Sequence, residues 1–175
     1  WDDLPDGPIV WANLSVIDDR GPAPAILNGL AGLGATLVVT GSPDNPILEG
    51  HHVYAADNLR TQAMARRASL SVTNADTTAI QQSLAAGTPV LVVPEPEEAV
   101  TYAHAVRAKG ACEVLEGGSP HADDVRLVVT RMLAEPHFRE AAAALAAQMA
   151  RYDAEALIVQ FVDQALEAQH GVAAA

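Results

Sequence analysis

Short apolar runs alternate along the chain with longer amphipathic stretches, which predicts strands separated by helices. Six of the apolar runs have the length and composition of strands. They cover residues 9–14, 36–40, 52–55, 69–73, 89–93 and 112–115. The run at 89–93 is Pro followed only by Val and Leu, as expected of a strand that is covered on both faces.

The stretches between these runs carry apolar residues at helical spacing. We expect helices over 22–33, 61–67, 77–86, 97–109, 122–134, 137–149 and 153–168. Asp76 is suited to cap the start of the helix at 77–86, because a short carboxylate accepts hydrogen bonds from the first free backbone amides. Gly87 is suited to end the same helix, because glycine adopts the positive φ common at that position.

Strands that alternate with helices form βαβ units, and right-handed crossovers then place helices on both faces of a parallel sheet. We therefore expect an α/β fold, a doubly wound Rossmann-like parallel sheet of about six strands. Residues 1–170 form one domain and 171–175 a disordered tail in this prediction. Such sheets bind ligands at the carboxyl ends of their strands. The loops after Leu14, Thr40, Thr73 and Val93 are therefore the candidate binding loops.

Composition narrows the possible partners. Half of the 175 residues are hydrophobic, and the net charge is −12. Such an acidic surface argues against nucleic acid and anionic membranes as binding partners. It does not exclude a phosphate ligand, because backbone amides at a helix start can bind phosphate. No apolar run is long enough to cross a membrane and no signal peptide is visible, so we expect a cytoplasmic protein. The lone Cys112 excludes a disulfide framework and is expected in the core.

Two segments with a fixed spacing carry a family resemblance. Residues 84–94 read Leu-Ala-Ala-Gly-Thr-Pro-Val-Leu-Val-Val-Pro, and 103–110 read Ala-His-Ala-Val-Arg-Ala-Lys-Gly. They resemble the signature of UDP- or TDP-sugar glycosyltransferases. In that family Glu-Ala-Leu-x-x-Gly-Val-Pro leads into a strand ending in Pro, and the following helix ends in Asn-Ala-x-x-Val-x-x-x-Gly.

The resemblance implies the C-terminal, nucleotide-sugar-binding half of a two-domain glycosyltransferase of the GT-B fold. The acceptor-binding N-terminal domain, which usually supplies the catalytic base, would precede Trp1. The chain begins without Met, so we expect a fragment that is inactive alone. The last helix resembles the segment that crosses back to that domain. The resemblance implies no catalytic residue, metal or cofactor in this chain; the nucleotide sugar is a substrate.

The loop that wraps the donor diphosphate in this family departs from its pattern here. The family sequence His-Gly-Gly-x-Gly-Thr aligns with residues 74–79, which contain none of the three glycines. Glycines let backbone amides approach phosphate closely. Asp76 instead places a carboxylate where the diphosphate would lie, while Asn74, Thr77 and Thr78 offer polar groups in partial replacement.

Four other donor positions of the family are also changed. Ser15 replaces the glycine after the first strand, and Asn58 begins the segment aligned with the base-stacking Trp-x-Pro. Gln82 replaces the glutamate that holds the ribose hydroxyls, and an amide can still hydrogen-bond there. Glu98, followed by Ala99, aligns with the Asp-Gln pair that contacts the donor sugar. The resemblance thus implies a donor site at Ser15, Asn58, Asn74, Thr77, Thr78, Gln82 and Glu98.

Each candidate residue also has a plainer interpretation. Asn74, Thr77 and Thr78 fit a capped polar loop as well as donor contacts. Gln82 and Glu98 are more often solvated or helix-starting residues than sugar ligands. The same holds for the arginines and histidines, which fit solvated or packed positions better than phosphate, metal or base roles: Arg60, Arg66, Arg67, His51, His52 and His104.

Three functional hypotheses remain open. The favoured one is the donor-binding domain of an enzyme that moves a sugar from UDP or TDP to an acceptor hydroxyl. The second is a scaffold or partner-binding domain whose donor site has decayed. The third is another sugar-nucleotide enzyme of similar architecture, such as an epimerase, although the spacing between Leu84 and Gly110 fits the transferases better. The base, sugar, acceptor and oligomeric state stay open.

Overall fold

A six-stranded, wholly parallel sheet forms the centre of the computed structural model, as the alternation of strands and helices predicts. The structure describes residues 4–14, 17, 19–57, 59–94, 101–116 and 120–173. The strand order is β3-β2-β1-β4-β5-β6, so its direction reverses between β1 and β4. The strands are β1 (Ile9–Asn13), β2 (Thr36–Thr40), β3 (Val53–Ala56), β4 (Leu70–Thr73), β5 (Val90–Val92) and β6 (Cys112–Val114).

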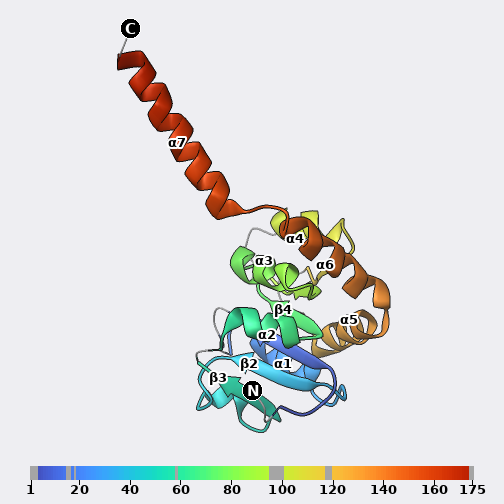
Figure 1. Ribbon diagram of the computed structural model, residues 1–175. Helices are drawn as coiled ribbons and strands as arrows, with labels where there is room; N and C mark the ends of the chain where they lie inside the picture. The colour runs from blue at the N-terminus through green and yellow to red at the C-terminus, as the bar shows by residue number, and fades with distance from the viewer. Residues whose placement is uncertain are drawn as a thin grey trace.

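Helices cover both faces of the sheet (Figure 1), which confirms the doubly wound arrangement. The α-helices are α1 (Ala23–Leu30), α2 (Thr61–Arg67), α3 (Thr77–Ala85), α4 (Thr101–Arg107), α5 (Ala122–Ala134), α6 (Pro136–Met149) and α7 (Ala154–Ala173). A short 3-10 turn, η1 (Pro46–Leu48), lies between β2 and β3.

The first face of the sheet is covered by α1 and α5. Alternate strand residues such as Val39 and Val72 meet Ile26 of α1 and Val129 of α5 in one buried cluster. The two helices approach each other closely at Gly29, where an added Cβ would lie 2.6 Å from the backbone oxygen of Ala122. Only glycine permits this separation, so the close contact between α1 and α5 depends on Gly29.

The second face is covered by α2, α3, α4 and α6. Trp11 of β1 is fully buried against Met64 of α2, and its indole Nε1 donates a hydrogen bond to Thr40 Oγ1 at 2.9 Å. Ile80 of α3 and Val106 of α4 pack on the adjoining part of the sheet. The side chains of successive strand residues thus point to opposite helical layers, as a period of two requires.

Several element boundaries differ from the sequence prediction. Helix α1 ends at Leu30 instead of residue 33, because Gly32 and Gly34 adopt φ values of +74° and +68° that no helix contains. Helix α4 begins at Thr101, and the expected start at residue 97 lies outside the described residues. Helix α7 continues to Ala173, past the expected end at 168 and into the segment 171–175 that we expected to be disordered.

Helix α7 extends away from the rest of the domain (Figure 1). Its described large apolar side chains lie between 48% and 75% exposed, and they are Leu157, Ile158, Val159, Phe161, Val162 and Leu166. None of the described helices combines the length and the apolar character required to cross a lipid bilayer.

Candidate functional site

Polar residues gather at the carboxyl ends of β1 and β4, where the strand order reverses. Asn13 of β1 lies beside Thr73 of β4 in the parallel register. Thr73 is fully buried, and Asn74, which follows it, is 3% exposed. Parallel α/β sheets bind ligands outside the carboxyl ends of their strands at such a reversal. The structure therefore places Asn74 at the edge where the sequence predicts the donor site.

The start of α3 faces this edge, and the carboxylate of Asp76 caps it. One oxygen of Asp76 accepts hydrogen bonds from the backbone amides of Thr78 at 2.8 Å and Ala79 at 3.4 Å. The amide of Asp76 itself donates to the carbonyl of Asn74. This confirms the predicted cap. It also shows that the side chain takes up two of the free amides that a bound phosphate would use.

The loop before α3 has an ordinary backbone in place of a glycine cradle. Asp76 has φ −63° and ψ 109°, and no non-glycine residue in the described part of the chain has a positive φ. Thr77 and Thr78 are exposed on the first turn of α3, so their hydroxyls are open to solvent at this edge. Hydroxyls and helix-start amides are thus the groups that this loop offers to an anion.

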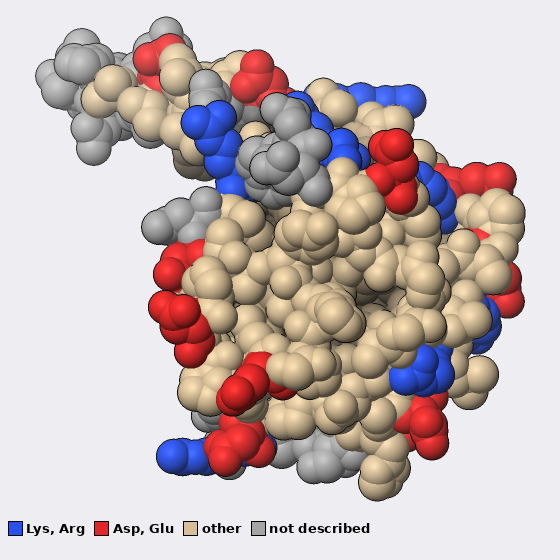
Figure 2. Space-filling view, turned by 90° about the horizontal axis from the view of Figure 1, so that it is seen from below, with Lys and Arg blue, Asp and Glu red and all other residues tan. Residues whose placement is uncertain are grey.

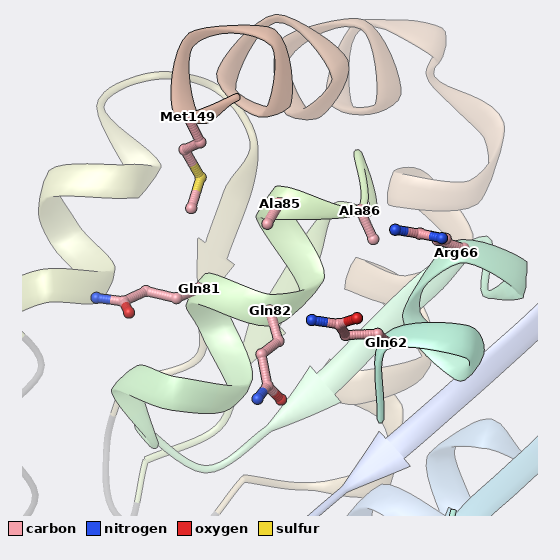
Figure 3. A pocket seen from close by; sticks show the side chains of 7 residues that line it. All are labelled: Gln62, Arg66, Gln81, Gln82, Ala85, Ala86 and Met149. Atoms are coloured by element: carbon pink, nitrogen blue, oxygen red, sulfur yellow. The ribbon is translucent and has the colours of Figure 1, made fainter. Parts of the chain in front are cut away.

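A hollow of about 270 Å³ lies between α2 and α3, along the later turns of α3. Gln62 and Arg66 of α2 line one side, and Gln82 of α3 lines the other (Figure 3). Gln81, Ala85 and Ala86 of α3 and Met149 of α6 complete its walls. The hollow has one charged residue among its lining residues, the guanidinium of Arg66.

Gln82 is the predicted site residue that lines this hollow, together with Gln62 and Arg66 of α2. Figure 3 shows its amide and that of Gln62 lying in the space between α2 and α3, while Gln81 points to the other side of α3. Gln62 is not among the residues that the sequence indicated, and Arg66 was expected on a solvated helix face. Their spacing of four residues, which puts both on one face of α2, is the signal that was available.

The other predicted positions fall into two groups. Ser15, Asn58 and Glu98 lie outside the described residues, so their predicted donor contacts stay predictions. Within the described residues, Asn74, Thr77 and Thr78 lie together at the start of α3. The structure thus brings Asn74, Thr77 and Thr78 together at the start of α3, and it places Gln82 farther along the same helix, where it lines the hollow.

Two residues outside this site follow the plainer sequence interpretations. His104 of α4 is half-buried, with its Nε2 3.6 Å from a carboxylate oxygen of Glu116. Cys112 is 1% exposed, and burial raises the pKa of its thiol to about 12, with Glu113 raising it further and Arg107 lowering it. In the described ranges no group of three or more His, Cys, Asp or Glu residues is placed to hold a metal ion.

Charged side chains are distributed without a basic patch on the face seen in Figure 2. Lys and Arg residues lie among Asp and Glu residues around an uncharged centre. This distribution is in keeping with a chain of net charge −12.

A family model matches more than half of the chain. Residues 50–158 match the glycosyltransferase family 28 C-terminal domain. A PGL/p-HBAD biosynthesis glycosyltransferase of Mycobacterium tuberculosis (strain ATCC 25177 / H37Ra) is 30% identical over 148 residues, 83% of this chain and 35% of that protein. A PGL/p-HBAD biosynthesis rhamnosyltransferase of Mycobacterium bovis (strain BCG / Pasteur 1173P2) is 32% identical over 149 residues, 83% of this chain and 33% of that protein. The chain thus spans about a third of the length of these relatives.

Several solved structures with the same fold are glycosyltransferases. The calicheamicin glycosyltransferase CalG4 superposes with a TM-score of 0.80 at 22% identity, over 94% of this chain and 43% of that one. The glycosyltransferase VinC in complex with DTDP gives a TM-score of 0.72 at 24% identity, over 83% and 38% of the two chains. At these identities the likeness establishes the fold. It confirms the prediction that this chain has the fold of one half of a GT-B glycosyltransferase.

Proposed function

Because the chain belongs to the glycosyltransferase family 28 C-terminal domain family, we propose that it binds the nucleotide-diphosphate sugar of a glycosyltransferase. The parent protein would transfer the sugar from this donor to an acceptor hydroxyl. On this proposal the nucleotide sugar is a substrate, and the domain requires no separate cofactor. A cytoplasmic location stays a prediction from the sequence.

One observation carries this proposal beyond family membership. The start of α3 lies at the carboxyl end of β4, at the reversal of strand order, and presents the exposed hydroxyls of Thr77 and Thr78 beside the two amides that Asp76 caps. A helix start favours negative charge, because its free amides and its dipole both point toward the anion. The diphosphate of a donor would lie here, against the first turn of α3.

The same groups would act during the reaction. When the bond between the sugar and the diphosphate breaks, negative charge grows on the departing phosphate oxygens. The amides at the start of α3 would stabilise that charge once the carboxylate of Asp76 shares or releases them. A base in the other domain would take the proton of the acceptor hydroxyl. The described residues of this chain would therefore bind and stabilise the donor, and the chain alone would not turn over.

The names of similar proteins guide the choice of nucleotide. VinC was solved with DTDP, and a spinosyn rhamnosyltransferase, SpnG, with thymidine diphosphate. The Mycobacterium bovis relative is described as a rhamnosyltransferase. We propose TDP as the first nucleotide to test for this chain, with UDP as the alternative.

Helix α7 supports a two-domain parent protein. Its exposed apolar side chains need a surface to cover them, and the part of the relatives that this chain matches is only about a third of their length. We propose that α7 packs on the acceptor-binding domain and that the acceptor reaches the donor between the two domains.

A second candidate function rests on Asp76. Its carboxylate already occupies the amides of Thr78 and Ala79 and opposes an anion there. In a chain that binds no donor, such a cap would stabilise α3 without competing with a ligand. In this alternative the fold acts as a scaffold or partner-binding domain that binds no nucleotide.

A thermal unfolding experiment separates the two functions. The chain is heated with millimolar TDP, UDP or GDP, and a ligand at about 100 times its dissociation constant adds about 2.7 kcal/mol to the free energy of unfolding. We expect stabilisation by TDP or UDP, and a smaller effect in Thr78→Ala. A well-folded chain that none of the nucleotides stabilises would favour the scaffold.

A further inference from the structure

The loops that follow β1 and β2 are joined at a single residue, Ile17. The side-chain amide of Asn45, in the loop after β2, donates a hydrogen bond from Nδ2 to the backbone carbonyl of Ile17 at 2.9 Å. We propose that Asn45 is a positioning residue for the donor, because it holds the loop after β1 where that loop can meet the diphosphate. This inference rests on the proposed function, since it names a residue that supports part of the same site.

The side-chain amide of Asn45 is used at both ends, which fixes its orientation. Its Oδ1 accepts a hydrogen bond from the backbone amide of Ile47 at 3.0 Å, while its Nδ2 donates to the carbonyl of Ile17. The two partners have opposite polarity, so turning the amide over would break both hydrogen bonds. Asn45 therefore connects the 3-10 turn η1 to the backbone of the loop after β1.

The backbone that carries Asn45 is anchored in the core. Leu48, the last residue of η1, is 5% exposed and belongs to the apolar cluster on the first face of the sheet. Its backbone amide donates to the carbonyl of Asn45 at 2.9 Å, and the amide of Asn45 donates to the carbonyl of Ser42 at 3.1 Å. These hydrogen bonds hold the backbone around Asn45, so its side chain offers a fixed support to the neighbouring loop.

A second contact holds Ile17 through its side chain. A Cβ at Gly41 would lie 2.7 Å from Cδ1 of Ile17, so this side chain rests directly on the backbone of the loop after β2. Gly41 has φ +156°, which side chains rarely permit, and its amide donates to the carbonyl of Ala56 at 3.1 Å. Ile17 also packs on the first-face cluster. The backbone and the side chain of Ile17 are thus both held from the loop after β2.

The loop after β1 borders the place where the diphosphate would lie. β1 is paired with β2 on one side and with β4 on the other, and the carboxyl end of β4 leads to α3. The loop after β1 therefore lies between Asn45 and the start of α3. The sequence indicates the loops after Leu14 and Thr40 as candidate binding loops, and the structure adds that the second supports the first. A diphosphate at the start of α3 would then meet a loop whose position depends on Asn45.

Calorimetric titration of the chain with TDP and TMP tests this inference. Asn45→Ser keeps a side-chain oxygen for the amide of Ile47, because serine caps helix starts well, but it removes the Nδ2 donor to Ile17. We expect this variant to bind TDP about tenfold more weakly, the effect of about one lost hydrogen bond. Its affinity for TMP should stay unchanged, because TMP lacks the second phosphate. Ile17→Ala, which removes the side chain that rests on Gly41, should weaken TDP with the same selectivity.

Arg126→Ala is the matched control, because Arg126 also ties two elements together. It donates from α5 to the carbonyls of Asn28 and Ala31 at 2.9 and 2.7 Å, at the end of α1 that precedes β2 and therefore at the opposite edge of the sheet. We expect Arg126→Ala to lower the melting temperature and to leave the affinity for TDP unchanged.

Three results would count against the role of Asn45 or of the site. A lower melting temperature of Asn45→Ser with an unchanged TDP affinity would show a purely structural tether and overturn this inference. Equal weakening of TDP and TMP would also overturn it, because the loop would then not act on the diphosphate. Both results leave the proposed function standing. A wild-type chain that binds neither TDP nor UDP would instead remove the proposed function, and the inference with it.

Discussion

Asp76 connects the stability of α3 to its capacity to bind an anion. Its carboxylate satisfies two backbone amides at the start of the helix, and an N-cap of this type typically contributes about 1 kcal/mol. A diphosphate at the same place would have to displace the side chain or share the amides with it. The residue that stabilises α3 therefore also lowers the affinity of this position for a donor.

The substitution Asp76→Asn separates these two roles. The asparagine side chain would still cap α3, because an amide oxygen accepts hydrogen bonds from the same backbone groups. The repulsion between a carboxylate and a diphosphate is removed, so we expect TDP to bind about fivefold more tightly, corresponding to about 1 kcal/mol for one charge near the surface. Calorimetric titration at low and high salt checks this, since the gain should shrink as salt rises. An unchanged affinity would place the diphosphate elsewhere.

Cys112 gives a prediction for alkaline pH. Its thiol has an ordinary pKa of 9.0 when unfolded and a pKa of about 12 when folded, chiefly because burial disfavours the thiolate. Between these values the unfolded chain loses a proton that the folded chain keeps, so the free energy of unfolding falls as pH rises from 9. Urea unfolding at about pH 8 and about pH 11 should show a larger loss for the wild type than for Cys112→Ala. Equal losses in both chains would contradict the raised pKa.

At the level of helices and strands, most of the architecture follows from patterns that a sequence displays. All six strands were predicted within two residues of their observed ends, because most of them are buried parallel strands and therefore continuous apolar runs. The length of α1 was overestimated, since helical spacing continues to Leu33 while Gly32 adopts a positive φ. The contact at Gly29 was not predictable, because it depends on where α5 lies.

The contact between α1 and α5 allows a direct test of packing. A methyl group at Gly29 would collide with the backbone oxygen of Ala122 and with Val125, whose Cβ would be 2.7 Å away. We expect Gly29→Ala to lower the free energy of unfolding by about 1–3 kcal/mol, the usual cost of overpacking, despite the better helix propensity of alanine. Urea denaturation measures this. Asn28→Ala, an exposed position on the same helix, should change it by less than about 0.5 kcal/mol.

The hollow between α2 and α3 shows why some of its lining residues could not be predicted from the sequence. Asn74, Thr77, Thr78 and Gln82 lie in one continuous segment, so an aligned motif is sufficient to find them. Gln62 and Arg66 join Gln82 only because α2 packs beside α3 in the folded domain. Such a site depends on which helix faces which neighbour, and local periodicity carries no information about that.

At the level of the whole molecule, α7 differs from every other described helix. Its apolar side chains are exposed, and a helix of 20 residues that extends into water has only local hydrogen bonds to hold it. The sequence predicted this helix from its periodicity. It could not predict that the helix would stand apart from the domain, because its apolar residues resemble those of a packed helix.

Removing α7 should improve the behaviour of the chain without unfolding it. A chain ending at Tyr152 lacks the exposed apolar residues, so we expect less self-association at the same concentration and a melting temperature within a few degrees of the full chain. Light scattering and calorimetry give the two values. TDP binding should also persist, because the start of α3 lies outside α7. A fall of more than about 10 °C, well beyond the shift expected from about 1 kcal/mol, would show that α7 stabilises the domain.

The position of β1 at the centre of the sheet has a consequence for how the chain is made. β1 begins at Ile9, yet one of its two neighbours, β4, is synthesised about sixty residues later, as the hydrogen bond from Ile9 to Ser69 illustrates. While the ribosome extends the chain, β1 therefore keeps one edge unpaired, with its peptide groups free to pair with another chain. Pairing over such long separations is slow. Newly made chains would therefore be most prone to aggregate before β4 emerges. Slower synthesis would lengthen that interval.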